Sequence, residues 1–171
     1  MVRNFALYCA NLDPRTEVPP PRILGRAAER TQPHIFSAAE IVLVMRRAHR
    51  LRDKYSPLRP HTYETLIGLL ACTGMRPCEA LHLKLSDFDP IRGTIRVPPL
   101  KASPERELPL HPTAVTALQG YLERRRHLCP MGDHLFVGPI GRPIARSNYS
   151  AIMHQLLRGI RSNGLRRTVR P

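Results

Sequence analysis

Acidic residues are scarce in this chain. Its 171 residues include 13 Asp and Glu against 27 Lys and Arg, which gives a net charge of +14 at pH 7. From Gly141 to Pro171 there are seven Arg and no acid. A basic surplus of this size predicts a polyanionic partner, most often a nucleic acid. A solvated basic surface or a GC-rich coding bias would give the same composition, so charge alone leaves these alternatives open.

The chain also lacks a cysteine framework and a long apolar run. Its four Cys are widely spread and no secretory signal is evident, which favours reduced thiols in a cytoplasmic protein. Cys72 and Cys78 have no matching Cys or His pair for zinc, so we expect both to be buried as small apolar side chains. No cluster of carboxylates suits a metal, and we expect no cofactor. No apolar run is long enough to span a membrane, so we expect no membrane partner.

The order of the segments predicts one main domain that follows a short helix and a linker. The first twelve residues carry apolar side chains at helical spacing, and Asp13 and Pro14 end this segment. Residues 17–34 are rich in Pro and Arg, which is typical of a linker. The main domain then covers residues 35–171, and a hydrophobic content of 42% is enough to bury a core.

Helix signals dominate the main domain. Ser37 and Glu40 form a capping box ahead of a stretch with helical periodicity, which predicts that a helix begins there. Further patterns predict helices over residues 61–73, 77–85, 112–126 and 149–160, the last ended by Asn163 and Gly164, and antiparallel strands at 91–97 and 107–110. The predicted fold class is therefore mainly α with a small antiparallel β-sheet (α+β).

One short stretch joins two of these helices at a tight corner. Residues 73–79 are Thr-Gly-Met-Arg-Pro-Cys-Glu. Gly74 is predicted to close the first helix in a left-handed conformation, and Pro77 suits the first position of the next. Arg76 is then held at the rim of an apolar core. A guanidinium held in this way is suited to binding a phosphate.

This corner resembles box I of the tyrosine recombinase (phage integrase) family, whose hallmark is Thr-Gly-x-Arg followed three residues later by Glu. Downstream, a strand, Lys101 and the Arg-Glu-Leu-Pro-Leu-His-Pro segment at 106–112 follow the order and spacing of that family. The resemblance covers most of the chain and implies the fold of that family's catalytic domain. It also implies that residues 1–16 are the last helix of an otherwise absent core-binding domain, and that residues 35–171 are a C-terminally incomplete catalytic domain.

The resemblance also implies a chemistry and assigns roles in it. Members of the family cleave DNA without metal: a Tyr attacks the scissile phosphate and forms a 3′-phosphotyrosine. Arg76 would stabilise charge in the transition state, Lys101 would protonate the leaving oxygen, and Glu79 would orient Arg76. The alternatives are a structural Arg at the corner, a solvated hairpin Lys and a Glu that favours the helix dipole. Around Lys101 the family's Gly-rich turn is replaced by prolines on both sides.

The sequence departs from the family after the last predicted helix. The family next requires His-x-x-Arg, a second His or Trp and the nucleophilic Tyr, and we find none of these motifs after Ile160. The five tyrosines all precede this point, and we expect them in the core or at an interface: Tyr8, Tyr55, Tyr63, Tyr121 and Tyr149. The sequence therefore predicts a truncated, inactive form of a site-specific DNA recombinase, with double-stranded DNA and further recombinase protomers as partners. A non-catalytic DNA-binding or regulatory remnant is the alternative.

Overall fold

The chain divides into two units, Met1–Pro33 and His34–Pro171. The computed structural model describes residues 2–20, 34–52, 56–100 and 104–160. In the first unit, α1 (Val2–Ala10) forms the helix predicted at the N-terminus and buries none of its residues. Its Arg3 Nε donates a hydrogen bond to the carbonyl oxygen of Pro19 at 3.1 Å, so the segment that follows α1 returns along the helix.

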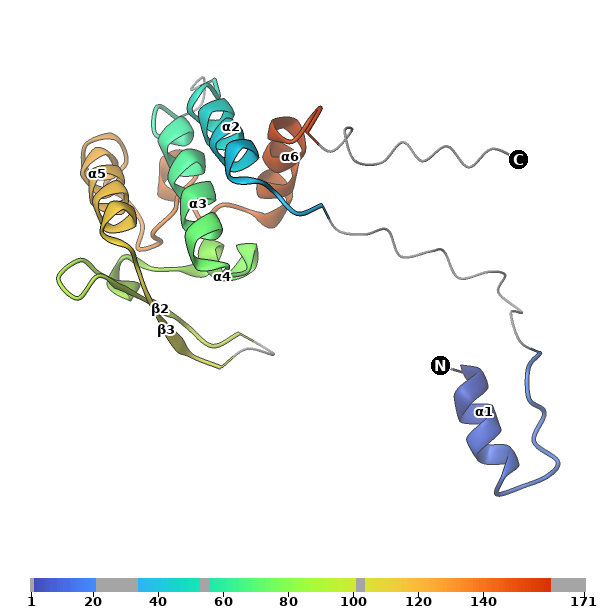
Figure 1. Ribbon diagram of the computed structural model, residues 1–171. Helices are drawn as coiled ribbons and strands as arrows, with labels where there is room; N and C mark the ends of the chain where they lie inside the picture. The colour runs from blue at the N-terminus through green and yellow to red at the C-terminus, as the bar shows by residue number, and fades with distance from the viewer. Residues whose placement is uncertain (1, 21–33, 53–55, 101–103, 161–171) are drawn as a thin grey trace. The chain divides into compact units, whose positions relative to one another are not determined.

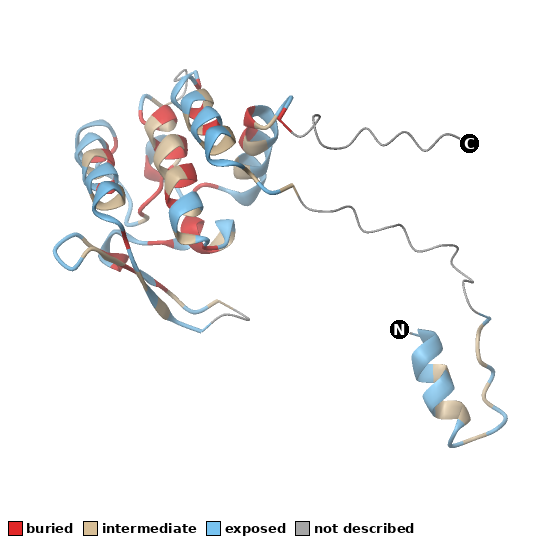
Figure 2. Cartoon of the chain, viewed as in Figure 1, coloured by how far each residue is buried: buried red, intermediate tan, exposed pale blue. Residues whose placement is uncertain are grey.

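The second unit is built mainly from helices, as predicted. These are α2 (Ala38–His49), α3 (Arg59–Thr73), α4 (Pro77–His82), α5 (Pro112–Leu128) and α6 (Arg146–Leu156). Helix α3 lies in the middle, with α2 and α6 on one side of it and α5 on the other (Figure 1). Buried residues are concentrated on α3 and on the segments that face it (Figure 2). The core therefore surrounds α3.

Local sequence signals set where α2 and α5 begin. Glu40 Oε2 accepts a hydrogen bond from the backbone N–H of Ser37 at 2.8 Å, and Ser37 Oγ accepts one from the backbone N–H of Glu40 at 3.3 Å. The predicted capping box is confirmed. Helix α5 begins at Pro112, also as predicted, and the preceding His111 accepts a hydrogen bond from the N–H of Thr113 at its Nδ1.

The predicted end of α6 is wrong. The helix ends at Leu156, whereas the pattern extended it to Asn163 and Gly164, which lie outside the described residues. Two features explain the earlier end. Gly159 has a φ of 80°, a conformation that glycine adopts readily after a helix. Arg47 on α2 donates a hydrogen bond to the carbonyl oxygen of Leu156 at 2.7 Å, which places a positive charge at the negative end of the helix.

A three-stranded antiparallel sheet follows α4 in the chain. Its strands β1 (Phe88–Asp89), β2 (Thr94–Val97) and β3 (Arg106–Pro109) pair in the order β1-β2-β3. The predicted strand pair is confirmed, with the fully buried Ile95 opposite Leu108. Strand β1 was missed because two residues are too few to show an alternating pattern. Strand β2 begins later than predicted because Asp89 Oδ1 accepts hydrogen bonds from two successive backbone N–H groups and forms a turn.

The cysteines differ from their predicted positions. Cys72 is exposed and Cys78 is half-buried, so the prediction that both are buried is wrong. Cys72 lies in the last turn of α3, next to the exposed Ala71, on a side of the helix that packing leaves uncovered. Cys129 is buried at the end of α5. Among the described residues, no helix has the length and apolar character needed to cross a bilayer.

Candidate active site

The corner between α3 and α4 has the geometry that its sequence predicts. Gly74 has a φ of 64° and donates its N–H to the carbonyl oxygen of Leu70 at 3.0 Å, which closes α3. The Thr73 hydroxyl donates to the carbonyl oxygen of Leu69 at 2.6 Å. Arg76 is then the extended residue before α4, and Pro77 is its first helical residue. Arg76 is thus fixed by its backbone between two helices.

A buried carboxylate, that of Glu79 on α4, contacts this corner. The side chain of Glu79 is 1% exposed, and its Oε2 accepts a hydrogen bond from the backbone N–H of Arg76 at 2.8 Å. Its Oε1 lies 3.4 Å from Nη1 of the Arg76 guanidinium. The carboxylate therefore contacts both the backbone and the side chain of Arg76.

A second arginine reaches the same carboxylate from the sheet. Arg106, the first residue of β3, donates from Nη1 to Glu79 Oε1 at 3.1 Å and from Nη2 to Oε2 at 2.7 Å. This is the bidentate pairing of a guanidinium with a carboxylate, which fixes orientation as well as distance. One buried Glu79 thus holds Arg76 and Arg106 together.

The sequence indicated part of this cluster. Of the predicted site residues, Arg76 and Glu79 are brought together, and Lys101 lies outside the described residues, between β2 and β3. Arg106 was not among the predicted site residues. The available signal was its place at the start of the motif at 106–112, but its pairing with a residue 27 positions earlier depends on how the sheet packs against α4.

The charges of the cluster favour binding of an anion. Two guanidiniums and one carboxylate leave a net charge of about +1. Hydrogen bonding to Glu79 raises the pKa of Arg106, so this guanidinium stays charged. Burial of Glu79 is tolerable because its oxygens are hydrogen bonded to charged donors. The Arg76 side chain is 66% exposed, so its planar group can meet a phosphate from solution.

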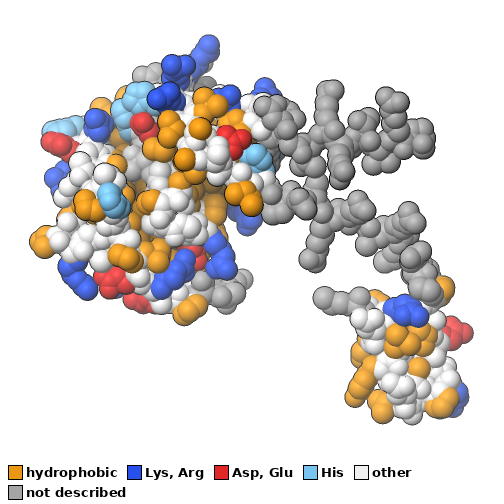
Figure 3. Space-filling view, in the orientation of Figure 1, with side chains coloured by type: hydrophobic (Ala, Val, Ile, Leu, Met, Phe, Trp, Pro, Cys, Tyr) orange, Lys and Arg blue, Asp and Glu red, His pale blue; other side chains and the backbone are white. Residues whose placement is uncertain are grey.

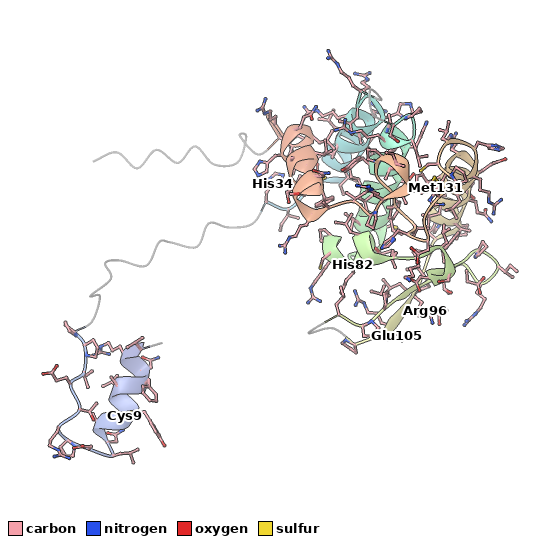
Figure 4. The ribbon with its side chains drawn as sticks, turned by 180° about the vertical axis from the view of Figure 1, so that it is seen from behind. Cys9, His34, His82, Arg96, Glu105 and Met131 are labelled. Carbon is pink, nitrogen blue, oxygen red and sulfur yellow. The ribbon has the colours of Figure 1, made fainter. Side chains whose placement is uncertain are left out.

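Further ion pairs connect the sheet to the α4 region. Arg96 on β2 donates from Nη2 to Asp87 Oδ1 at 3.1 Å, and Asp87 Oδ2 accepts from the backbone N–H of Lys84 at 2.8 Å. Lys84 Nζ in turn lies 2.8 Å from a carboxylate oxygen of Asp133. Figure 4 shows Arg96 and His82 at this same end of the unit. These contacts hold β2 against the segment after α4, and β2 in turn pairs with β3, which carries Arg106.

The described tyrosines lie in varied surroundings. Tyr63 and Tyr121 are 5% and 1% exposed, so their predicted core positions are confirmed, and burial raises the pKa of both. Tyr149 is half-buried, and burial raises its pKa as well. Tyr8 is exposed on α1, and Tyr55 lies outside the described residues. A raised pKa lowers the fraction of reactive phenolate, so the three described tyrosines of the second unit are poorly suited to act as nucleophiles at neutral pH.

Known proteins resemble this chain in sequence and in structure. Residues 40–170 match the phage integrase family. A Sinorhizobium fredii protein named as an integrase/recombinase, y4rB, is 33% identical over 168 residues, which cover 95% of this chain and 54% of that protein. Tyrosine recombinase XerC of Roseiflexus sp. is 28% identical over 149 residues, which cover 84% of this chain and 44% of that protein.

A solved structure has the same fold. The Tn1549 transposon integrase, in complex with a circular intermediate DNA, matches with a TM-score of 0.62 at 17% identity, over 83% of this chain and 51% of that chain. The predicted fold, mainly α with a small antiparallel sheet as in tyrosine recombinase catalytic domains, is confirmed. The chain spans about half the length of the curated relatives that it matches. Because the family match extends over most of its residues, the chain belongs to the phage integrase family.

Proposed function

We propose that this chain supplies the charge-stabilising part of an active site that cleaves and rejoins DNA strands through a phosphotyrosine intermediate. The observation that carries the proposal is the buried carboxylate of Glu79, which holds the guanidiniums of Arg76 and Arg106 together. Such a rigid cationic pair suits the extra negative charge of a pentacoordinate phosphate. The integrase and recombinase names of the relatives support this function.

Each site residue has a separate role in the proposed reaction. Arg76, with its exposed guanidinium, contacts the scissile phosphate and stabilises the transition state. Glu79 positions Arg76 and does not contact DNA, because it is buried. Lys101 protonates the leaving 5′ oxygen. A Lys is charged at neutral pH, and transfer of its proton to an alkoxide is favourable.

We propose double-stranded DNA as the partner, with further recombinase protomers bound to the same DNA. The net charge of +14 and the DNA complex of the Tn1549 integrase support this assignment. In this arrangement residues 1–16 belong to a core-binding domain, residues 17–34 are the linker, and the catalytic domain starts at residue 35. Duplex binding should weaken steeply as salt rises, because phosphate contacts release counterions. Binding that does not depend on salt, or no binding at low salt, would contradict the proposal.

The roles of Arg76 and Lys101 can be separated by one experiment. It uses a protein in which this chain continues through the His-x-x-Arg and Tyr motifs of the family. Arg76→Ala and Lys101→Ala should each lower cleavage at least ~100-fold while leaving DNA binding largely intact, because the lost contacts act in the transition state. A substrate with sulfur in place of the leaving 5′ oxygen needs little protonation. It should rescue Lys101→Ala alone, and equal rescue of both variants would contradict the assignment.

We also propose that the 171 residues by themselves do not cleave DNA. Tyr63 and Tyr121 are buried, and the pKa of Tyr149 is raised, so these side chains are poorly suited to attack a phosphate. Incubation of the chain with nicked suicide substrates should give no covalent protein–DNA adduct. An adduct mapped to any of the five tyrosines would refute this. Should the extended protein bind DNA and still fail to cleave it, the non-catalytic DNA-binding remnant would be the better interpretation.

A further inference from the structure

A second cluster of polar side chains lies at the opposite end of α3. His49 is the last residue of α2, and His61 and Glu64 lie one turn apart near the start of α3. His49 Nδ1 is 2.8 Å from Glu64 Oε2, and the His49 and His61 ring centroids are 5.6 Å apart. One ligand atom from each of the three residues lies within 4.8 Å of the other two. Two imidazoles and a carboxylate thus converge from two packed helices.

This cluster is separate from the site around Arg76. His61 and Thr73 are twelve residues apart on one helix, which corresponds to about 18 Å along its axis at 1.5 Å per residue. Figure 3 shows histidine, acidic and basic side chains gathered at the end of the unit where α2 stops and α3 begins. A ligand bound there would not touch the proposed phosphate site.

We propose that His49, His61 and Glu64 bind a zinc ion that links the end of α2 to the start of α3. Two imidazoles and one carboxylate form a ligand set that zinc accepts in proteins, with a fourth position left for water. The ion would stabilise the second unit by bridging two helices, and it would take no part in DNA cleavage. The proposal does not depend on the function assigned to the Arg76 site.

The distances require only small side-chain movements. Zinc binds imidazole nitrogen at about 2.0–2.1 Å and carboxylate oxygen at about 2.0–2.2 Å, so two ligand atoms of a tetrahedral ion lie roughly 3.3 Å apart. The observed separations, from 2.8 Å to at most 4.8 Å, bracket this value. The side chains of His49 and Glu64 are 57% and 34% exposed, so they have room to rotate. Changes in side-chain angles can therefore close the site without moving either helix.

Arg124 limits how tightly this cluster can hold a cation. The residue lies on α5 and lines the same hollow as His49, His61 and Glu64. Its guanidinium repels a bound cation and so lowers the affinity of the site.

A cavity supplies space for the fourth ligand. A hollow of about 680 Å³ between α2, α3 and α5 is lined by all three ligand residues, together with Met45, Gly68 and other residues of these helices. A water bound to the ion can occupy this space. Sequence patterns do not indicate this site, because His49 comes from a different helix. A His and a Glu three residues apart on one helix are a weak signal on their own.

Titration of the complete 171-residue chain with Zn²⁺ tests the proposal. Isothermal calorimetry should show one ion bound per chain. Loss of outer partners of metal ligands alone lowers affinity ~10–100-fold, so His61→Ala and Glu64→Gln, which remove ligands, should lower it by about 100-fold or more. His82→Ala is the matched control, because His82 is a histidine on α4 whose Nδ1 is 2.6 Å from the Cys78 carbonyl oxygen. It should bind Zn²⁺ as the unmodified chain does.

Two further measurements keep the test independent of folding and of thiols. Arg124→Gln should raise the affinity several-fold, a gain that a misfolded variant would not give. Co²⁺ in place of Zn²⁺ should give a spectrum without a thiolate charge-transfer band, because no Cys is among the ligands. No saturable Zn²⁺ binding, the same affinity in His61→Ala and Glu64→Gln as in the unmodified chain, or a thiolate band would overturn the proposal.

Discussion

Two carboxylates near opposite ends of α3 differ in burial and in the number of their hydrogen bonds. The buried one holds its neighbours in place, and the more exposed one is free to bind a ligand. Glu79, just beyond the C-terminal end, is 1% exposed and is hydrogen bonded to two guanidiniums and a backbone N–H. Glu64, near the start, is 34% exposed and contacts His49. A buried carboxylate must be fully paired, and full pairing fixes its neighbours. An exposed one can exchange a proton, a water or a metal ion at little cost.

A third carboxylate shows that local sequence does not decide between these outcomes. Glu40 and Glu79 each accept a hydrogen bond at 2.8 Å from the backbone N–H three residues earlier, at the start of a helix. Glu40 remains near the surface, with a side chain 29% exposed. Glu79 is covered by the sheet and receives Arg106. The same capping contact therefore only stabilises the start of α2 at Glu40, whereas at Glu79 it is part of a candidate active site.

The largest expected difference between the two ends of α3 is in stability. Glu79→Ala leaves Arg106 without its bidentate partner and removes a capping contact, so we expect the free energy of unfolding to fall by about 3 kcal/mol. Glu64→Ala removes a carboxylate that is only partly buried, so it should cost less than about 1 kcal/mol. Urea denaturation followed by circular dichroism measures both. Equal losses for the two variants would contradict the distinction drawn from burial.

A smaller effect is expected from changing the geometry of the buried pair and keeping its charge. Arg106→Lys retains a cation and loses the planar fork that binds both oxygens of Glu79, which should destabilise the chain by about 1.5 kcal/mol. Arg92→Lys is the control, because its ion pair with Glu107 is exposed on both sides. That variant should lie within about 0.5 kcal/mol of the unmodified chain in the same urea titration.

The corner that holds Arg76 can be tested through its glycine. Gly74 has a φ of 64°, and among the described residues no atom outside its neighbours in the chain lies within 4 Å of the place that a Cβ would occupy. Gly74→Ala should therefore destabilise the chain by about 1 kcal/mol through backbone conformation alone. Gly74→Asn should cost less, because Asn tolerates left-handed angles better than Ala. Thermal unfolding compares the two, and a larger loss in the Asn variant would indicate a steric cause.

The smallest effect concerns pH and the partly exposed carboxylate of Glu40. The hydrogen bond from the Ser37 backbone, first among several causes, lowers the pKa of Glu40 below 4.5. A lowered folded-state pKa adds stability that is present above the unfolded value and is lost as pH falls through the folded value. Glu40→Gln should therefore be less stable than the unmodified chain at pH 7, and the gap should narrow below pH 4.5. A gap that stays constant with pH would show that charge does not contribute.

Sequence-based prediction succeeded where the signal is short in range. The starts of α2, α4 and α5 depend on Ser37, Pro77 and Pro112, each of which acts on its own few residues. The end of α6 was mispredicted at residues 163–164 because the helical pattern continues past Leu156, whereas the left-handed Gly159 and the contact from Arg47 end the helix there. The two-residue strand β1 carried too little pattern to be recognised. Sequence-based predictions failed where the end of a helix or the pairing of a strand depends on residues far away in the sequence.

In the candidate active site, local residues alone set the corner between α3 and α4. Gly74 and Pro77 fix how one helix stops and the next begins, so Arg76 is placed by backbone conformation that neighbouring residues dictate. The contact of Arg106 with the carboxylate of Glu79 depends on how the sheet packs, and the contact of His49 with Glu64 depends on how α2 packs against α3. Caps and turns act through bonds within a few residues, whereas burial and long-range pairing arise only when separate elements pack together.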